Sequence, residues 1–161
     1  MIIVNVIGGL GNQMFQYAFG YAVSKKHNTE LRIDIGGFDV CRLRNYELHL
    51  YQVKESAIFE FKYKFLLDSF NIKSRGLSTR VLQKLSMKIL NLSSFFYQER
   101  RDFFFDEKVF NVRQGTYFYG YWQNEKYFRE YRDVLLEIFT LNSIHSQTKE
   151  YRQKIIPPSL R

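Results

Sequence analysis

The chain has 161 residues, of which 45% are hydrophobic, 25% charged and 18% aromatic. This composition excludes a globally disordered chain and predicts one globular core of ordinary size. The single cysteine, Cys41, excludes a disulfide framework within the chain and fits a reducing compartment. The net charge of +8 would suit binding to nucleic acid or to an anionic membrane. Where the basic residues lie along the chain bears on both possibilities.

The first predicted element is a buried strand over residues 2–7. This run is apolar and rich in β-branched side chains, which is typical of a strand covered on both faces in a parallel sheet. The longer stretch 1–23 is apolar enough to be mistaken for a signal peptide or a membrane anchor. It lacks a basic leader and is interrupted by Gly-Asn-Gln, so we expect neither a signal peptide nor a transmembrane helix.

A glycine-rich turn, Gly8-Gly9-Leu10-Gly11-Asn12-Gln13, follows this strand. Glycines let a backbone approach a ligand closely, and the first N–H groups of a helix attract anions. We expect Asn12 to be the N-cap of a helix that runs to about His27, with its amide bonded either to a free backbone N–H or to a ligand. A plain strand-to-helix turn is the alternative. A dinucleotide-binding fingerprint is disfavoured, because Met14 stands where its third glycine should be.

A second strand is predicted over residues 31–35, and it closes a βαβ unit with the first strand and helix. Asp34 lies near the carboxyl end of this strand, where open α/β sheets bind their ligands. It is therefore our candidate for a polar contact or a catalytic base. A structural role, in which Asp34 accepts hydrogen bonds from the loop amides of Gly36 and Gly37, is an equal alternative.

The excess of basic charge is concentrated in residues 60–101, which hold nine basic and three acidic side chains. Within this segment, residues 78–92 have helical periodicity, with a basic stripe beside an apolar face. The predicted helix either lies on an anionic membrane surface, close to a lipid-linked acceptor, or packs on the core with its charged side in solvent. No nucleic-acid-binding module is recognised, so no nucleic-acid partner is expected.

Strand, polar turn and helix recur late in the chain. Residues 116–122 are β-branched and aromatic, which predicts a strand, and Asn124 is expected to cap a long helix that follows. The carboxyl ends of parallel strands meet at one edge of a sheet. We therefore expect Trp122, Gln123 and Asn124 to lie at the same edge as Asn12.

Two strings resemble the α-1,2-fucosyltransferases, which transfer fucose from GDP-fucose to a sugar hydroxyl. Residues 8–18, Gly-Gly-Leu-Gly-Asn-Gln-Met-Phe-Gln-Tyr-Ala, are similar to the opening signature of this family. Residues 119–128, Tyr-Gly-Tyr-Trp-Gln-Asn-Glu-Lys-Tyr-Phe, are similar to a later segment, in the right order. A shorter string, residues 44–48, resembles the Arg-x-Tyr-Glu-Leu segment that often follows the second strand.

The resemblance, to glycosyltransferase family 11, implies an α/β fold with a Rossmann-like parallel sheet and flanking helices, one lobe of a GT-B enzyme. It implies transfer of fucose from GDP-fucose to a galactose-containing glycan in α-1,2 linkage, with inversion, in the synthesis of a surface glycan such as O-antigen. It implies no obligatory metal or other cofactor, and the sequence has no Asp-x-Asp pair for a diphosphate-bound cation. A cytoplasmic or peripheral membrane location is expected.

Residues 1–156 are expected to form the amino-terminal, acceptor-side domain, and residues 157–161 a tail or truncated junction. The arginines of the family's His-x-Arg-Arg-x-Asp box meet the donor diphosphate, and this sequence has no such box. We therefore expect the donor-binding half to be absent and this chain alone to be inactive or nearly so. The alternative is a non-catalytic α/β remnant, or a module that binds carbohydrate or a membrane surface.

The transfer requires stabilisation of the leaving diphosphate and removal of a proton from the acceptor. By resemblance, the expected cleft residues are Gly9, Gly11, Asn12, Gln13, Trp122 and Gln123. Asp34 remains the candidate base, and no metal-binding residues are expected.

Overall fold

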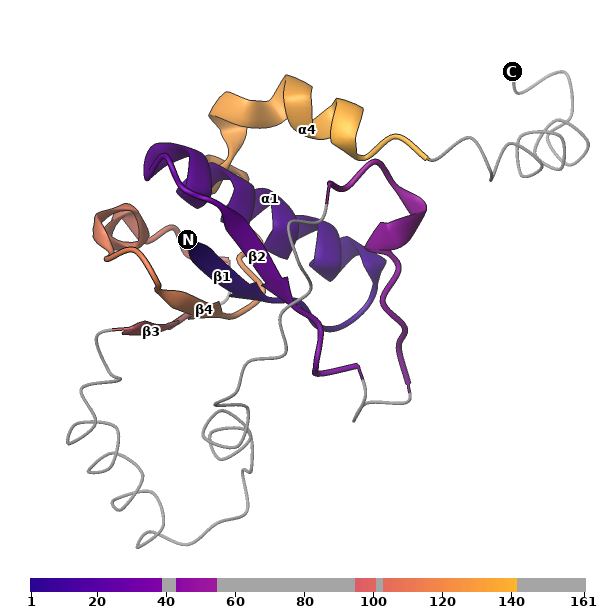
Figure 1. The fold of residues 1–161 in the computed structure, drawn as a ribbon, viewed down its shortest axis with the longest axis horizontal. Coiled ribbons are helices and arrows are strands. Elements are labelled where there is room, and N and C mark those ends of the chain that lie inside the picture. Colours follow the sequence, from indigo (N-terminus) through magenta and orange to yellow (C-terminus); the bar gives the residue numbers. More distant parts are fainter. Residues whose placement is uncertain (39–42, 55–94, 101–102, 142–161) are drawn as a thin grey trace, which may run out of the picture.

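The computed structural model describes residues 1–38, 43–54, 95–100 and 103–141 (Figure 1). Four strands form a parallel sheet in the order β2-β1-β4-β3. They are β1 (Ile2–Asn5), β2 (Leu31–Asp34), β3 (Phe96–Gln98) and β4 (Tyr117–Tyr119). The predicted α/β fold, with a Rossmann-like parallel sheet and flanking helices, is confirmed.

The first half of the sheet is the predicted βαβ unit. All four residues of β1 are buried, as expected for a strand covered on both faces. Helix α1 (Leu10–Lys26) connects it to β2, which pairs with β1 in parallel register. The helix ends at the C-cap residue His27, and Asn28 follows with a left-handed φ of 46°. Asn tolerates this conformation better than most residues do.

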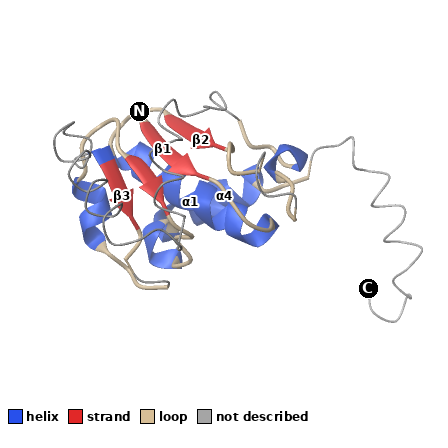
Figure 2. Ribbon diagram, turned by 90° about the horizontal axis from the view of Figure 1, so that it is seen from below, coloured by secondary structure: helices blue, strands red, loops and turns tan. Residues whose placement is uncertain are grey.

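Helix α1 lies between the sheet and α4 (Arg132–Ile138) in Figure 1, and Figure 2 shows the same strands and helices from below. Its inner face places Phe19 in the core beneath the sheet. Its outer face contacts the layer above, where the ring of Tyr17 lies 5.8 Å from that of Phe139 and the ring of Tyr21 lies 5.7 Å from that of Tyr131. A helix covered on both sides is apolar nearly all round, which explains its sequence.

The segment after Asn124 differs from the single long helix that we predicted. Two 3-10 turns, η4 (Glu125–Tyr127) and η5 (Arg129–Tyr131), precede the seven-residue α4 (Arg132–Ile138). They are separated at Phe128, whose φ of −133° is far from helical values. The predicted N-cap is confirmed, since the Asn124 side-chain oxygen accepts the Lys126 N–H at 3.1 Å.

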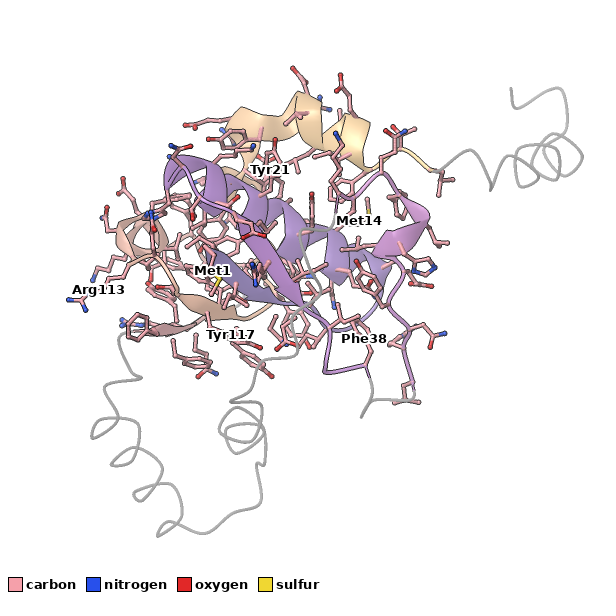
Figure 3. All side chains as sticks on the ribbon, in the orientation of Figure 1. Met1, Met14, Tyr21, Phe38, Arg113 and Tyr117 are labelled. Carbon is pink, nitrogen blue, oxygen red and sulfur yellow. The ribbon has the colours of Figure 1, made fainter. Side chains whose placement is uncertain are left out.

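The face of the sheet opposite α1 is lined by a smaller cluster of Ile3 and Tyr117, with Phe96 and Tyr119 packed against it. Figure 3 shows Tyr117 on the far side of the sheet from Tyr21. The basic helix predicted over residues 78–92 lies outside the described residues. No helix in the described part of the chain combines the length and hydropathy needed to cross a bilayer.

Candidate functional site

The glycine turn joins β1 to α1 at the carboxyl edge of the sheet. Gly8 has a left-handed φ of +83°, which glycine adopts without steric cost. The N-cap of α1 is Gly9, no side chain bonds to this cap, and the first turn contains no acidic residue. The predicted N-cap at Asn12 is wrong. Gly9 already has the extended backbone of a cap, so the helix begins at Leu10 and Asn12 lies inside its first turn.

Two glycines of this turn are not explained by packing. A Cβ added at Gly9 or Gly11 would meet no atom of the described residues within 4 Å. At Gly20, in the same helix, an added Cβ would lie 2.7 Å from side-chain carbons of Val4 and Leu31. Packing therefore requires Gly20 but not Gly9 or Gly11. The space at these two glycines, beside a helix N-terminus without a side-chain cap, can accommodate an anionic group.

Gln13 links the glycine turn to residues 45–47 by hydrogen bonds. Its side chain is fully buried. The Nε2 group donates to the carbonyl oxygens of Gly8 at 2.9 Å and Asn45 at 2.8 Å, and Oε1 accepts the Glu47 N–H at 2.9 Å. These bonds give Gln13 a structural role, because its oxygen and both N–H donors are engaged within the chain. The expected contact between Gln13 and a sugar nucleotide stays a prediction.

Two more amides link the turn to the end of β4. Gln16 is also fully buried, and it accepts the Ile7 N–H at 2.9 Å and donates to the Gly120 carbonyl at 3.0 Å. The Asn12 Oδ1 atom accepts a hydrogen bond from Gln123 Nε2 at 2.8 Å. Asn12 and Gln123 are therefore in contact, and Gln123 lies at the same sheet edge as Asn12, as the repeated strand-turn-helix order predicted. All three strings that carried the family resemblance, residues 8–18, 44–48 and 119–128, meet around this turn.

Trp122 lies in the core and not at the glycine turn. It is 1% exposed, and its ring stacks on Phe19 with centroids 4.1 Å apart. The predicted strand over 116–122 ends earlier, at Tyr119, and Trp122 has a left-handed φ of 56°. This conformation is uncommon for a bulky residue. The Glu99 carboxylate holds it by accepting the N–H groups of Tyr121 at 2.6 Å and Trp122 at 3.1 Å.

Asp34 is buried on the sheet face opposite α1. Its Oδ1 atom accepts the Gly36 N–H at 2.9 Å, which confirms the structural alternative for that amide. Its Oδ2 atom accepts the Tyr117 hydroxyl at 2.7 Å. Burial, and then the Asp34 carboxylate, raise the pKa of Tyr117 well above its usual range, so this hydroxyl stays protonated and donates. A role for Asp34 as the catalytic base stays a prediction.

Sequence reasoning missed Glu99 and Gln16, although each carried a signal. Glu99 follows an aromatic strand directly, as Asp34 ends β2. Gln16 stands three residues after Gln13, which puts both amides on one side of an otherwise apolar helix. No group of three metal-binding side chains occurs among the described residues.

The chain is 33% identical over 165 aligned residues to an alpha-1,2-colitosyltransferase of Escherichia coli. This match covers 93% of the chain and 48% of that protein, so the chain spans about half the length of its curated relative. No family model matches the chain, and no solved structure does. The match supports a relation to fucosyltransferase-like glycosyltransferases, in agreement with the two long strings of the sequence.

Proposed function

We propose that this chain forms the amino-terminal, acceptor-side part of a family 11 glycosyltransferase with a GT-B fold. The enzyme would transfer fucose from GDP-fucose to a galactoside hydroxyl in α-1,2 linkage, with inversion and without an obligatory metal, during synthesis of a surface glycan. The observation that carries this proposal is the glycine turn. Gly9 and Gly11 leave space at a helix start without a side-chain cap, within the string that resembles the family signature.

The turn suits the charge that develops in this reaction. In an in-line displacement the acceptor hydroxyl attacks C1 of the sugar, the bond from C1 to the diphosphate breaks, and negative charge collects on the diphosphate oxygen. The N–H groups at the start of α1 present a partial positive charge to such an anion. Each charge-assisted hydrogen bond contributes about 1.5–3 kcal/mol. The remaining diphosphate contacts are assigned to the arginine box of a companion half.

The transferred sugar has two candidates. The sequence strings resemble fucosyltransferases, whereas the relative is named for the transfer of colitose. A turn that contacts the diphosphate accepts either sugar, because it does not read the sugar ring. Residues that choose between fucose and colitose are therefore expected outside residues 8–13.

A transfer assay tests the proposal on the protein in the longest form that its gene encodes. GDP-fucose and the GDP derivative of colitose are offered with lactose, and the linkage of the product is determined by NMR. Gly11→Leu fills the open space at the turn and is expected to lower kcat/KM at least tenfold. The matched control Lys25→Leu, near the other end of the same exposed helix surface, is expected to stay within twofold of wild type. Wild-type activity in Gly11→Leu would contradict the assignment.

Peripheral contact with an anionic membrane is the second proposal, and it rests on the concentration of basic residues in 60–101. The sequence-predicted basic helix of residues 78–92 would bring the enzyme to a lipid-linked acceptor on the cytoplasmic face. Co-sedimentation with anionic vesicles is expected at low salt and should fall away at high salt. Equal binding to neutral vesicles would contradict this mode of attachment.

A further inference from the structure

A cavity of about 310 Å³ lies beside β3, the outer strand of the described sheet. This volume is at the lower end of the range of about 300–1,000 Å³ that is typical of small-molecule sites. Its walls combine aromatic rings with charged side chains. The rings are those of Tyr97, Phe104, Trp122 and Tyr127, and the charged side chains are Glu99, Arg100, Asp106 and Lys108.

The acidic groups around the cavity are already engaged. Asp106 accepts the Tyr97 hydroxyl at 2.7 Å and the Lys108 N–H at 3.1 Å. The bond from Tyr97 lowers the pKa of Asp106, while burial and this same bond raise the pKa of Tyr97 to about 12. The pair is therefore a neutral phenol bonded to a carboxylate at neutral pH. Glu99 is occupied by the backbone of Tyr121 and Trp122.

The basic groups, in contrast, remain available. The exposed side chains of Arg100 and Lys108 form no ion pair with any described residue. Both carry N–H donors and no acceptor, so they suit a ligand that offers oxygen atoms. Asp106 balances part of their charge without accepting from their side chains.

Trp122 provides a further donor. Its indole Nε1 is buried and has no hydrogen-bond acceptor among the described residues. Buried polar groups are nearly always paired, because leaving one unpaired is costly. An oxygen atom of a ligand bound in the cavity that Trp122 lines would supply the acceptor that the described residues do not.

We propose that this cavity binds one pyranose ring of the glycan acceptor. A sugar ring presents C–H groups that pack against the negative face of an aromatic ring, and its hydroxyls accept hydrogen bonds at the periphery. Phe104 is 59% exposed and offers such a ring face at the cavity. Arg100, Lys108 and the Trp122 indole supply the donors. The choice of a glycan as ligand rests on the function proposed above.

The position of the cavity fits this role. Trp122 precedes Gln123, whose amide bonds to Asn12 in the glycine turn. Glu99 and Trp122 follow β3 and β4, so the cavity reaches the same carboxyl edge as the turn. A sugar bound beside Trp122 would therefore lie at the carboxyl edge of the sheet, where the sugar-nucleotide donor is expected.

Trp122 is the single tryptophan of the 161 residues, so its fluorescence reports on this cavity. Titration of the 161-residue chain with methyl β-galactoside or lactose is expected to change the emission in a saturable way. Sorbitol, which has hydroxyls but no ring, is expected to have no effect. We expect Phe104→Ala to weaken binding at least fivefold and Lys108→Gln at least threefold. The matched control is Phe103→Ala, an adjacent ring that is 67% exposed and does not line the cavity.

The inference is overturned if neither sugar gives a saturable change, if sorbitol matches the sugars, or if the Phe103 and Phe104 variants behave alike. Far-UV circular dichroism of each variant verifies folding. A failure here is distinct from a failure of the proposed function, because Gly11→Leu is expected to lower kcat/KM for transfer at least tenfold and to leave the galactoside titration unchanged. Sugar binding without any transfer in the longest natural form would retain the cavity as a glycan site and reject the enzyme.

Discussion

After β1 the chain turns through Gly8 into a helix start that no side chain caps, with open space at Gly9 and Gly11. After β4 it turns through Gly120, and there the Glu99 carboxylate accepts two successive backbone N–H groups. The second corner thus contains its own anion, whereas the first turn of α1 contains no acidic residue and no side-chain cap. From this difference we infer that the first corner serves an anionic ligand, and that Glu99 fixes the backbone of the second corner.

The two corners also differ in packing. Trp122 stacks on Phe19 and meets Phe118 edge-on, with ring centroids 5.6 Å apart. Its left-handed backbone costs about 1–3 kcal/mol, which the surrounding ring contacts and the Glu99 bonds offset. Among the described residues, no packing contact explains Gly9 and Gly11 at the first corner. The following four predictions test this difference, from the largest expected effect to the smallest.

Trp122→Ala removes the centre of the second corner. We expect the free energy of unfolding to fall by about 3–5 kcal/mol, as for large-to-small changes at buried aromatic residues. Urea denaturation followed by far-UV circular dichroism measures it. Tyr121→Ala, at the exposed neighbouring position, is the control and should cost about 0.5 kcal/mol. Similar losses in both variants would show that the corner is not held by the indole.

Gln13→Leu separates a structural role from a ligand contact. It leaves the Gly8 and Asn45 carbonyls and the Glu47 N–H without their partner, so we expect a loss of about 2–3 kcal/mol. Gln114→Leu, at an exposed position, is the control. If Gln13→Leu keeps full stability but loses turnover with GDP-fucose, Gln13 contacts the donor and our structural assignment is wrong.

Glu99→Gln tests the internal anion directly. The amide keeps one acceptor oxygen but loses the charge that bonds two N–H groups, which should cost about 1–2 kcal/mol of stability. Glu130→Gln, whose side chain is 72% exposed and 3.9 Å from Lys26, should change stability by less than about 0.5 kcal/mol. Equal stability of the two variants would show that the Glu99 carboxylate does not stabilise the second corner.

Gly11→Ala and Gly20→Ala form a matched pair within α1. Alanine favours a helix over glycine by about 1 kcal/mol, so Gly11→Ala should raise stability by up to that amount. Gly20→Ala should lower it by about 1 kcal/mol, because the added carbon crowds Val4 and Leu31. Donor turnover should fall in Gly11→Ala despite its higher stability. A variant that is more stable and fully active would show that the space at Gly11 serves no ligand.

The local part of the fold was determined by the sequence alone. The apolar run, the glycine turn, the apolar helix and the second strand lie next to one another in the chain, so hydrophobic periodicity is sufficient to predict their order. The capping signal was not sufficient, because it placed the N-cap of α1 at Asn12 and the structure has it at Gly9. The N-cap at Asn124 was likewise predicted from the local sequence. The sequence also predicted that Gln123 would lie at the same sheet edge as Asn12, because strand-turn-helix order places both after parallel strands.

Only the tertiary structure decided what each polar side chain faces. Gln13 bonds a carbonyl 32 positions away, and Asn12 bonds an amide 111 positions away. The indole of Trp122 lies in the core, where it stacks on the ring of Phe19. The helical segment after Asn124 is interrupted at Phe128. Local secondary-structure propensity carries no information about partners this far apart in the sequence. The sequence of a glycine turn is the same whether its amide side chain bonds to a ligand or to another part of the chain. The strand order β2-β1-β4-β3 decides which segments lie within reach of that amide.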